Sequence, residues 1–382
     1  MNADLLVVGA GPAGCAAAVA ARRRAPSLRV VVVDSASFPR EKPCGGAIPG
    51  GGLSELARAG LALRVPHVRV DHAVLRVGGR STRVRLKRPA AVVHRREFDL
   101  DLVAQAREAG AGVLEESPLG SLRLFDGGGG VATAGGREIR FRVAVAADGA
   151  SGTSRRLLGL PPGRRVPLRE VTVEGRALPD LLFDLDEGLP GYAWRFPSAR
   201  QGRPVESVGV YSTEPAPALS GRLGAFVERE RPGLELRPFS PEPWALRMFD
   251  SGGPVGAGPV LLAGDALGAD PLAGEGIRYA LWSGRTAGEL AARARGGLLA
   301  TSAGPGLLRG AYRLRLAASR SGLALELACR LAPRLYGPEA GPWRALASDR
   351  EVAEALADVV SGLPLPAPAL RLASRYRALR RR

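Results

Sequence analysis

The chain is poor in several residue types, and each shortage argues against a class of protein. Only Lys42 and Lys87 are lysines among 54 basic residues, and the 382 residues include three cysteines and three histidines. These are Cys15, Cys44, Cys329, His67, His72 and His94. An odd number of cysteines without metal-like spacing argues against a disulfide framework and a zinc site. The scattered histidines form neither a metal motif nor a catalytic triad, so we interpret them as structural. A reducing cytoplasm is the expected location.

The chain carries a large excess of positive charge, which is spread along its whole length. A formal net charge of +17 would ordinarily suggest nucleic acid as a partner. Here nearly all of it is arginine spread along the whole chain, together with abundant alanine, glycine and proline, which indicates a compositional bias. We therefore expect no nucleic-acid partner. A basic surface would still attract anionic lipid or a diphosphate substrate.

Residues 4–34 contain the strongest functional signal. An apolar run at residues 5–8 predicts a buried parallel strand, which is followed by glycines at dinucleotide-binding spacing and by a helix of small residues. The residues concerned are Gly9, Gly11, Ala13 and Gly14. Gly9 is expected to allow a tight turn, Gly11 to let the backbone approach a diphosphate, and Gly14 to let the helix pack closely. The helix N-terminus would offer free N–H groups and a positive dipole end to that diphosphate.

A second strand, over residues 28–33, ends at an acidic residue. The carboxylate of Asp34 would hold the two ribose hydroxyls and repel a 2′-phosphate. The tightly bound dinucleotide is therefore expected to be FAD or NAD rather than NADP. Residues 3–21 could also be interpreted as a signal peptide or membrane helix, but Asp4, the missing early basic region and the glycine spacing argue against this.

The rest of the chain predicts an α/β fold. Helices are expected at about residues 54–59, 95–109 and 274–295. Continuous apolar runs predict buried strands at 143–147 and 260–263, and shorter strands are expected at 113–116, 121–125, 131–134 and 139–142. Alternating residues around Gly78-Gly79 predict an antiparallel hairpin.

The predicted domains are interleaved. Residues 1–165 and 255–300 are assigned to a Rossmann-like dinucleotide-binding domain, with a β-hairpin insertion at about 65–93. Residues 166–254 are strand-like, broken by prolines and without long helical periodicity, so they are assigned to a substrate domain built on a mostly antiparallel β-sheet. Residues 301–382 are assigned to a helical C-terminal region, broken at Pro333, Pro338 and Pro342.

Three further stretches combine glycines with charged residues. Residues 95–102 (RREFDLDL) place Arg95 at a helix start, and residues 147–156 (ADGASGTSRR) place Asp148 and Gly149 after an apolar run. Residues 262–277 contain LAGDA and DPLAGEGI, which supply Asp265, Ala266, Gly274, Gly276 and Ile277. In this order and spacing, residues 1 to about 300 resemble the FAD-dependent group that includes the aromatic hydroxylases and the geranylgeranyl reductases.

The resemblance implies FAD-binding roles for the last stretch. Asp265 would hydrogen-bond the ribityl chain, and Ala266 would lie beside the diphosphate. Gly276 and Ile277 would begin a helix whose positive end faces the flavin pyrimidine edge, where negative charge gathers on reduction. A plain helix cap is the simpler interpretation of Asp265.

The resemblance also assigns roles to the two earlier stretches. Arg95 would contact FAD, although an ordinary surface arginine is the alternative. Asp148 and Gly149 would serve FAD and an incoming nicotinamide cofactor, where the alternative is a simple turn. All of these simpler interpretations holding together, in this order, is improbable.

Within the group, two segments are similar to the geranylgeranyl reductases. The first is residues 42–46 (KPCGG), in which Cys44, Gly45 and Gly46 would cross the flavin. The thiol of Cys44 would contact FAD or pair with Cys329, and both possibilities stay open.

The second segment is residues 191–197 (GYAWRFP), similar to the YxWxFP segment of that family. Placed on a strand over the flavin, Tyr192 can donate a proton, while Trp194 and Phe196 can line an apolar tunnel for an isoprenoid chain. An aromatic stripe that simply fills the core is the alternative.

These resemblances predict an FAD-dependent reductase that saturates carbon–carbon double bonds of a prenyl chain, with NADPH or NADH as electron donor. The substrate would be a hydrophobic small molecule or a prenyl lipid, and a diphosphate, a lipid and a quinone tail all stay open. The alternatives are an FAD-dependent monooxygenase, a flavin-binding protein without turnover and a nucleic-acid binder. A halogenase is disfavoured because residues 40–50 lack the Gly-Glu-Ser element. The basic residues 371–382 form either an amphipathic helix at a membrane surface or a solvated terminus.

Overall fold

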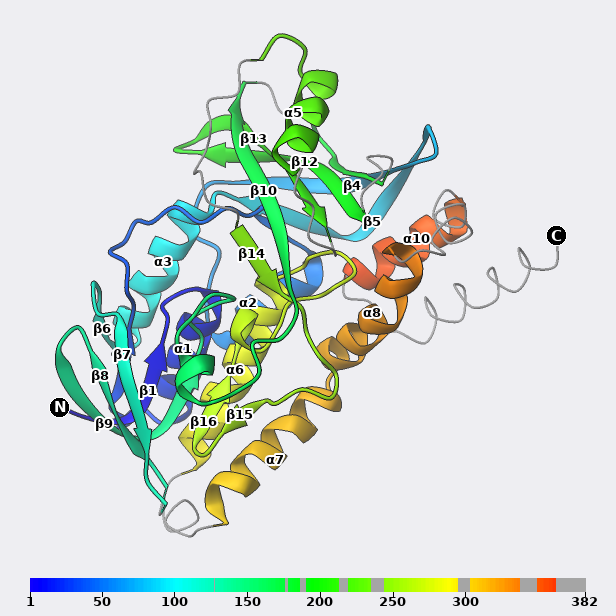
Figure 1. Cartoon of the computed structure of the whole chain (residues 1–382). Coiled ribbons are helices and arrows are strands. Elements are labelled where there is room, and N and C mark those ends of the chain that lie inside the picture. The colour runs from blue at the N-terminus through cyan, green and yellow to red at the C-terminus, as the bar shows by residue number, and fades with distance from the viewer. Residues whose placement is uncertain are drawn as a thin grey trace.

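Two sheets organise the part of the chain that the computed structural model describes (Figure 1). This part comprises residues 1–126, 128–175, 178–185, 190–212, 219–234, 244–294, 303–336 and 349–361. The first sheet has strand order β15-β16-β9-β1-β2-β6 with β8 and β7 attached through β9, and the second has order β14-β10-β13-β12-β11-β4-β5-β3. The α/β fold with a second, mostly antiparallel sheet is confirmed.

The core of the first sheet is parallel. Strand β1 (Asn2–Val8) lies between β2 (Val30–Val33) and β9 (Arg137–Ala146), and all three run in the same direction. Parallel strands β6 (Gly112–Leu114) and β16 (Val260–Leu262) extend it on either side. The antiparallel members are β7 (Leu119–Leu124), β8 (Gly130–Ala134) and β15 (Gly256–Ala257). A parallel sheet is covered on both faces, which explains the unbroken apolar runs in its central strands.

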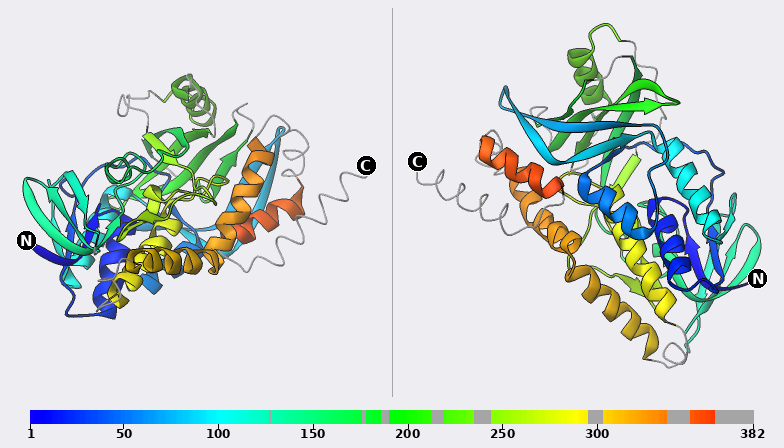
Figure 2. Two further views of the ribbon diagram at one scale, coloured as in Figure 1. Left: turned by 60° about the horizontal axis from the view of Figure 1, so that its bottom comes forward. Right: turned by 180° about the vertical axis from the view of Figure 1, so that it is seen from behind.

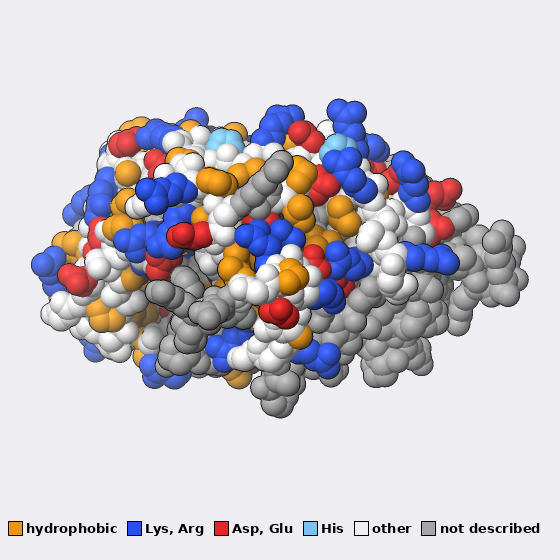
Figure 3. Space-filling model, turned by 90° about the horizontal axis from the view of Figure 1, so that it is seen from above, with side chains coloured by type: hydrophobic (Ala, Val, Ile, Leu, Met, Phe, Trp, Pro, Cys, Tyr) orange, Lys and Arg blue, Asp and Glu red, His pale blue; other side chains and the backbone are white. Residues whose placement is uncertain are grey.

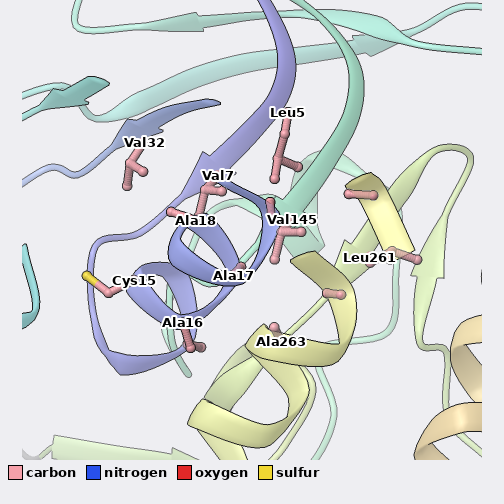
Figure 4. Packing of buried hydrophobic residues seen from close by; sticks show 14 of the residues in the cluster. Leu5, Val7, Cys15, Ala16, Ala17, Ala18, Val32, Val145, Leu261 and Ala263 are labelled. Atoms are coloured by element: carbon pink, nitrogen blue, oxygen red, sulfur yellow. The ribbon is translucent and has the colours of Figure 1, made fainter. Parts of the chain in front are cut away.

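Helices α1 (Pro12–Arg24) and α6 (Ile277–Arg293) pack against this sheet and against each other. Figure 4 shows the small side chains of α1 beside Val7 of β1 and Val145 of β9. A Cβ on Gly284 or Gly288 of α6 would lie 2.0 Å from the carbonyl oxygen of Ala13 or 2.1 Å from that of Ala17, respectively. The two helices therefore touch backbone to backbone.

Four further elements lie around the first sheet or on the helices that cover it. They are α2 (Gly50–Ala59), α3 (Arg95–Glu108), α4 (Ser154–Leu157) and the 3₁₀ turn η1 (Gly264–Ala266). Helix α3 packs on α1, and α2 packs on α6. Cys15 of α1 is fully buried, and its thiol lies 3.2 Å from the carbonyl oxygen of Ala10.

The second sheet is antiparallel except where β11 runs parallel to β4. Its strands are β3 (Ala47–Ile48), β4 (His67–Val77), β5 (Arg80–Val93), β10 (Arg165–Glu174), β11 (Leu181–Asp184), β12 (Gly191–Arg200), β13 (Arg203–Ser212) and β14 (Trp244–Arg247). The predicted hairpin at about 65–93 is thus β4–β5, and it forms part of this second sheet. Two chain segments that are distant in sequence build the sheet together.

The two faces of the second sheet have different partners. Helix α5 (Leu219–Glu230) covers the outer face through Leu223 and Phe226. On the inner face, α8 (Arg320–Tyr336) and α10 (Arg350–Val360) pack against the aromatic residues of β12 and against β5. Figure 2 shows α7 (Gly304–Ala317), α8 and α10 following one another along one side of the molecule.

Several expected boundaries were wrong. Residues 139–142 and 143–147 are not two strands but the two halves of β9, of which only the second is continuously apolar because it alone lies between β1 and β16. Helix α2 begins at Gly50 rather than near residue 54, and α6 begins at Ile277 rather than Gly274. The 166–254 segment contains α5, although no long helical periodicity was expected there.

The C-terminal region also differs from expectation. Pro333 does not break α8, because it lies in the last turn and removes only a hydrogen bond near the helix end. Pro338, Pro342 and the basic residues 371–382 lie outside the described residues. Among the helices that are described, none has the length and apolarity to span a membrane. In the view of Figure 3, arginine and lysine side chains are distributed among acidic and apolar ones.

Candidate functional site

The carboxyl ends of four parallel strands meet around one cleft. The turns after β1, β2, β9 and β16 place Gly9, Asp34, Asp148 and Asp265 in its wall. Its volume is about 460 Å³. Ligands of open α/β sheets bind outside these strand ends. We call this cavity the cofactor cleft.

The glycine turn at the start of α1 forms one side of the cofactor cleft. Gly9 has φ +99°, and a Cβ there would lie 2.4 Å from the carbonyl oxygen of Ala147. A Cβ on Gly14 would lie 1.8 Å from the carbonyl oxygen of Gly9, so only glycine fits at either position. Gly11 caps α1 without a side-chain hydrogen bond, and Ala13 lies in the cleft wall. The first N–H groups of α1 are therefore available to an anion.

Asp34 is held rigidly at the rim of the cleft. Its Oδ2 accepts a hydrogen bond from the N–H of Ala10 at 2.7 Å, and its Oδ1 accepts one from the N–H of Ala36 at 2.9 Å. Each carboxylate oxygen has a further lone pair, so these bonds leave acceptor capacity for ribose hydroxyls. The geometry fits the role expected from the sequence.

Two buried polar atoms in the wall of the cleft have no hydrogen-bond partner among the described residues. They are Oδ1 of Asp148 and Nε of Arg40. The other oxygen of Asp148 accepts a bond from the N–H of Ser154 at 2.8 Å, while burial raises the pKa of this carboxyl. Unsatisfied buried polar atoms are costly, and a bound polar molecule would satisfy them. The cleft therefore fits a dinucleotide.

Asp265 connects the cleft to the loop at residues 42–46. Lys42 Nζ lies 3.6 Å from Asp265 Oδ2, and Gly276 is close enough that a Cβ there would lie 3.5 Å from Asp265 Oδ1. Ala266 follows in η1 but is fully buried and lines neither the cleft nor the cavity described next. Its carbonyl oxygen accepts a hydrogen bond from Arg155 at 3.0 Å.

A second cavity of about 120 Å³ continues from the cleft toward the second sheet. Pro12, Lys42, Asp265 and Ala280 line both. The predicted site residues in its wall are Cys44, Gly45, Gly46, Arg95, Tyr192, Trp194, Gly274, Gly276 and Ile277. We call it the aromatic cavity. The start of α6 lies in its wall, so the positive end of the helix dipole lies at this cavity.

The aromatic residues of the second sheet are both buried and in the cavity wall. Tyr192 and Trp194 are 7% and 4% exposed. The ring of Tyr192 lies 5.5 Å from that of Phe183 and 5.3 Å from that of Tyr211. The hydroxyl of Tyr192 donates to the carbonyl oxygen of Ala273, and burial raises the pKa of this tyrosine. Its proton thus holds the loop that leads into α6.

Arg95 is not a surface residue. It is 5% exposed, and its guanidinium donates to both carboxylate oxygens of Asp99 at 2.8 and 2.7 Å. Burial opposes the charged form of Arg95, but the fully buried Asp99 outweighs it and raises the pKa of the arginine. Arg40 Nη2 approaches the same carboxylate to 3.1 Å. Arg95 therefore supports the wall between Arg40 and Cys44.

All three cysteines are free thiols. Cys44 lies in the wall of the aromatic cavity, and its sulfur accepts a hydrogen bond from the N–H of Gly46 at 3.4 Å. Cys329 instead lies 3.7 Å from the carbonyl oxygen of Phe249. The structure therefore contains no Cys44–Cys329 disulfide.

Two residues of the site escaped the sequence analysis. Arg40 belongs to residues 39–42 (PREK), just before the glycine loop. A basic residue soon after the strand that ends at Asp34 was the sequence feature that could have indicated a role in the cleft. Glu275, between two predicted glycines, lines the aromatic cavity with a side chain only 7% exposed. Burial and nearby Asp270 raise the pKa of Glu275 to about 7, despite the proximity of Arg278. Over the described residues no cluster of His, Cys, Asp and Glu is arranged for a metal ion.

The cleft with a helix N-terminus at its wall suits a dinucleotide, and the comparisons with known proteins identify the chain as an FAD-dependent oxidoreductase. The model of the FAD binding domain family matches residues 2–184. A menaquinone reductase of Mycolicibacterium smegmatis is 34% identical over 89% of this chain and 88% of its own length. A digeranylgeranylglycerophospholipid reductase of Methanopyrus kandleri is 31% identical over 77% of this chain and 81% of its own.

A solved structure shares the whole fold. The geranylgeranyl bacteriochlorophyll reductase-like protein of Thermoplasma acidophilum superposes with a TM-score of 0.76 and 21% identity, covering 100% of this chain and 98% of that one. The chain belongs to the geranylgeranyl reductase family of FAD-dependent oxidoreductases.

Proposed function

We propose that the protein is a reductase that saturates carbon–carbon double bonds of a prenyl chain. The observation that carries this proposal is the continuity of the cofactor cleft with the aromatic cavity, because it places an apolar, ring-lined space next to the expected flavin position. The curated relatives named above are reductases whose names specify a prenylated quinone and a prenylated lipid. A prenyl diphosphate, a prenylated lipid and a prenylated quinone are the three candidate substrates.

The residues of the cofactor cleft would hold FAD. The N-terminus of α1 would receive the diphosphate, Asp34 the ribose hydroxyls, and Asp265 the ribityl chain. Asp148 and Gly149 would complete the cleft wall. The N-terminus of α6 would place its dipole at the flavin pyrimidine edge. When bound and reduced, FAD supplies a hydride, and we propose NADPH or NADH as the source of its electrons.

The aromatic cavity would bind the double bond and exclude water. Trp194 and Tyr192 form one wall, and Cys44 lies in the wall as well. Saturating an alkene needs a proton in addition to a hydride. Tyr192 is the proton-bearing group that the sequence analysis singled out, and the thiol of Cys44 is a second such group in the cavity wall. The bond from Tyr192 to Ala273 makes Cys44 the better placed of the two, because the tyrosine proton is already engaged.

The decisive experiment is anaerobic. FAD-loaded protein is reduced with dithionite, mixed with a prenylated substrate and analysed by mass spectrometry. We expect the product to gain one molecule of H₂ per double bond without oxygen. Product that forms only when oxygen is admitted would contradict the proposal and favour the monooxygenase alternative. In a separate anaerobic cuvette without dithionite, bleaching of the oxidised flavin by NADPH or NADH identifies the electron donor.

We further propose contact with an anionic membrane surface, since prenyl lipids reside there. Leu307 and Leu314 of α7 are 55% and 69% exposed and one heptad apart, and Arg313 lies beside them. An apolar stripe with arginine neighbours suits the interface of an anionic bilayer. Co-sedimentation with phosphatidylglycerol vesicles should fall in Leu314→Asp and stay unchanged in Leu100→Asp, which is exposed on α3. Equal binding of both variants would contradict this contact.

A further inference from the structure

The inner face of the second sheet changes from apolar to polar along its strands. On β10, Leu168 is followed on the same face by Glu170 and Thr172. Across the sheet, Gly209 pairs with both Glu170 and Trp194. The aromatic cavity covers the apolar end of this face. The polar end borders a third cavity of about 280 Å³, which we call the polar chamber.

The polar chamber lies beside the aromatic cavity. Lys42, Pro43, Cys44 and Arg95 line both spaces. The other residues around the chamber are Glu41, Val93, His94, Glu170, Thr172, Ser198, Val205, Ser207 and Trp244. A molecule with one part in the aromatic cavity and another in the polar chamber would lie along the loop that contains Cys44.

The charged groups of the chamber wall already have partners. Lys42 lies 3.6 Å from Asp265, and Arg95 is bound to Asp99. Glu41 lies 3.3 Å from a guanidinium nitrogen of Arg96. Each cation of the described wall, Lys42 and Arg95, thus already lies beside a carboxylate. A diphosphate brings several negative charges, and desolvating them without dedicated cations is unfavourable.

The groups that lack partners are neutral. Oγ of Ser198, a residue 3% exposed, and Nδ1 of His94 are buried and have no hydrogen-bond partner among the described residues. Burial lowers the pKa of His94, so its ring is neutral near pH 7. Burial raises the pKa of Glu170 to about 7, although the Ser207 hydroxyl and the N–H of Cys44 favour its charged form. Ser198 and His94 thus offer neutral hydrogen-bonding groups without partners, which suit carbonyl and hydroxyl groups.

We propose that the polar chamber binds a neutral, carbonyl- or hydroxyl-bearing head of the prenyl substrate, as in a prenylated quinone, while the chain enters the aromatic cavity. The proposal rests on the proposed function and selects among its three candidate substrates. A quinone carbonyl would accept a hydrogen bond from Ser198. The side chain of Trp244, 37% exposed at the chamber wall, offers an indole surface to a flat ring.

The test measures binding without turnover. Protein loaded with oxidised FAD is titrated calorimetrically with menadione, a naphthoquinone ring without a prenyl chain, and separately with inorganic diphosphate. We expect menadione to bind and diphosphate not to compete. Ser198→Ala should weaken menadione binding about fivefold, the value of one hydrogen bond near 1 kcal/mol, with FAD content unchanged. Ser81→Ala, an exposed serine on β5 of the same sheet, is the matched control.

Three results would overturn the proposal. They are absence of menadione binding, equal affinity in the Ser198→Ala and Ser81→Ala variants, and displacement of menadione by diphosphate. Because the flavin stays oxidised, none of these results depends on catalysis. A protein that saturates prenyl diphosphates but does not bind menadione would retain the proposed function and lose the head-group site. A protein that binds menadione at Ser198 but saturates no prenyl chain would retain the head-group site and lose the proposed function.

Discussion

Replacing Gly209 by alanine should disturb the aromatic cavity without touching the cofactor cleft. A Cβ on Gly209 would lie 2.1 and 2.3 Å from two ring carbons of Trp194 and 2.6 Å from the carbonyl oxygen of Arg169. The indole must move, and its 3.1 Å hydrogen bond to Ser207 would be lost. That bond is worth about 1 kcal/mol, and overpacking a core costs about 1–3 kcal/mol. The expected loss of stability is therefore about 2–4 kcal/mol.

The assay compares melting temperature, FAD affinity and prenyl saturation in one preparation. At roughly 2 °C per kcal/mol, Gly209→Ala should melt about 4–8 °C lower than the wild type. FAD affinity should persist, because Gly209 is not in the wall of the cofactor cleft, whereas prenyl saturation should fall with the displaced Trp194. Gly221→Ala in α5 is the control, because a Cβ there meets no atom within 4 Å. If both variants melt and turn over alike, the assignment of Trp194 to a tightly fitted cavity wall is wrong.

Three further substitutions test the site. Arg95→Ala leaves the buried carboxylate of Asp99 short of its main partner and should cost about 3 kcal/mol in the free energy of unfolding by urea, in addition to any loss of FAD. In the wild type, Arg95 helps to lower the pKa of Asp99 below 3.8. The ion pair therefore stabilises the fold fully above that pH, and this stabilisation is lost as the pH falls through the lowered pKa. An acid transition that is unchanged in Arg95→Ala would contradict this reasoning. Asp265→Ala should give soluble protein that has lost its flavin absorbance, and retained stoichiometric FAD would argue against the assignment. Tyr192→Phe should weaken FAD binding about fivefold through the loosened Ala273 loop and leave turnover of the loaded enzyme largely intact, whereas loss of turnover alone would restore Tyr192 as the proton donor.

The sequence predicted the first sheet well because its strands are buried on both faces. Residues 5–8, 143–147 and 260–263 are continuous apolar runs, and each leads to a turn at the same edge of the sheet. The second sheet was harder. Its eight strands come from separate parts of the chain, and no local pattern shows that the hairpin β4–β5 pairs with β11. Helix α5 carried a signal in the spacing of Leu219, Leu223 and Phe226, which the surrounding prolines obscured.

In the candidate site, too, some features could be predicted from the sequence and others could not. Turns that follow strands, such as those at Gly9 and Asp34, could be placed from sequence because strand direction fixes where they meet. Contacts between distant segments could not. Nothing in the sequence indicates that Arg40 approaches the buried carboxylate of Asp99, or that Ala266 turns into the core toward Arg155. The polar chamber likewise depends on five strands, the start of α3 and a loop that only tertiary structure brings together.

The contact between α1 and α6 has a consequence for the size of molecule that the protein accepts. Main-chain atoms meet at Ala13 and Ala17, so neither helix can slide along the other without collision. One helix begins at the diphosphate turn and the other at the aromatic cavity, and their starting points are held at a constant spacing. The two helix N-termini therefore accept a ligand of one length. A mononucleotide such as FMN would reach only one of them, and the full length of FAD would contact both.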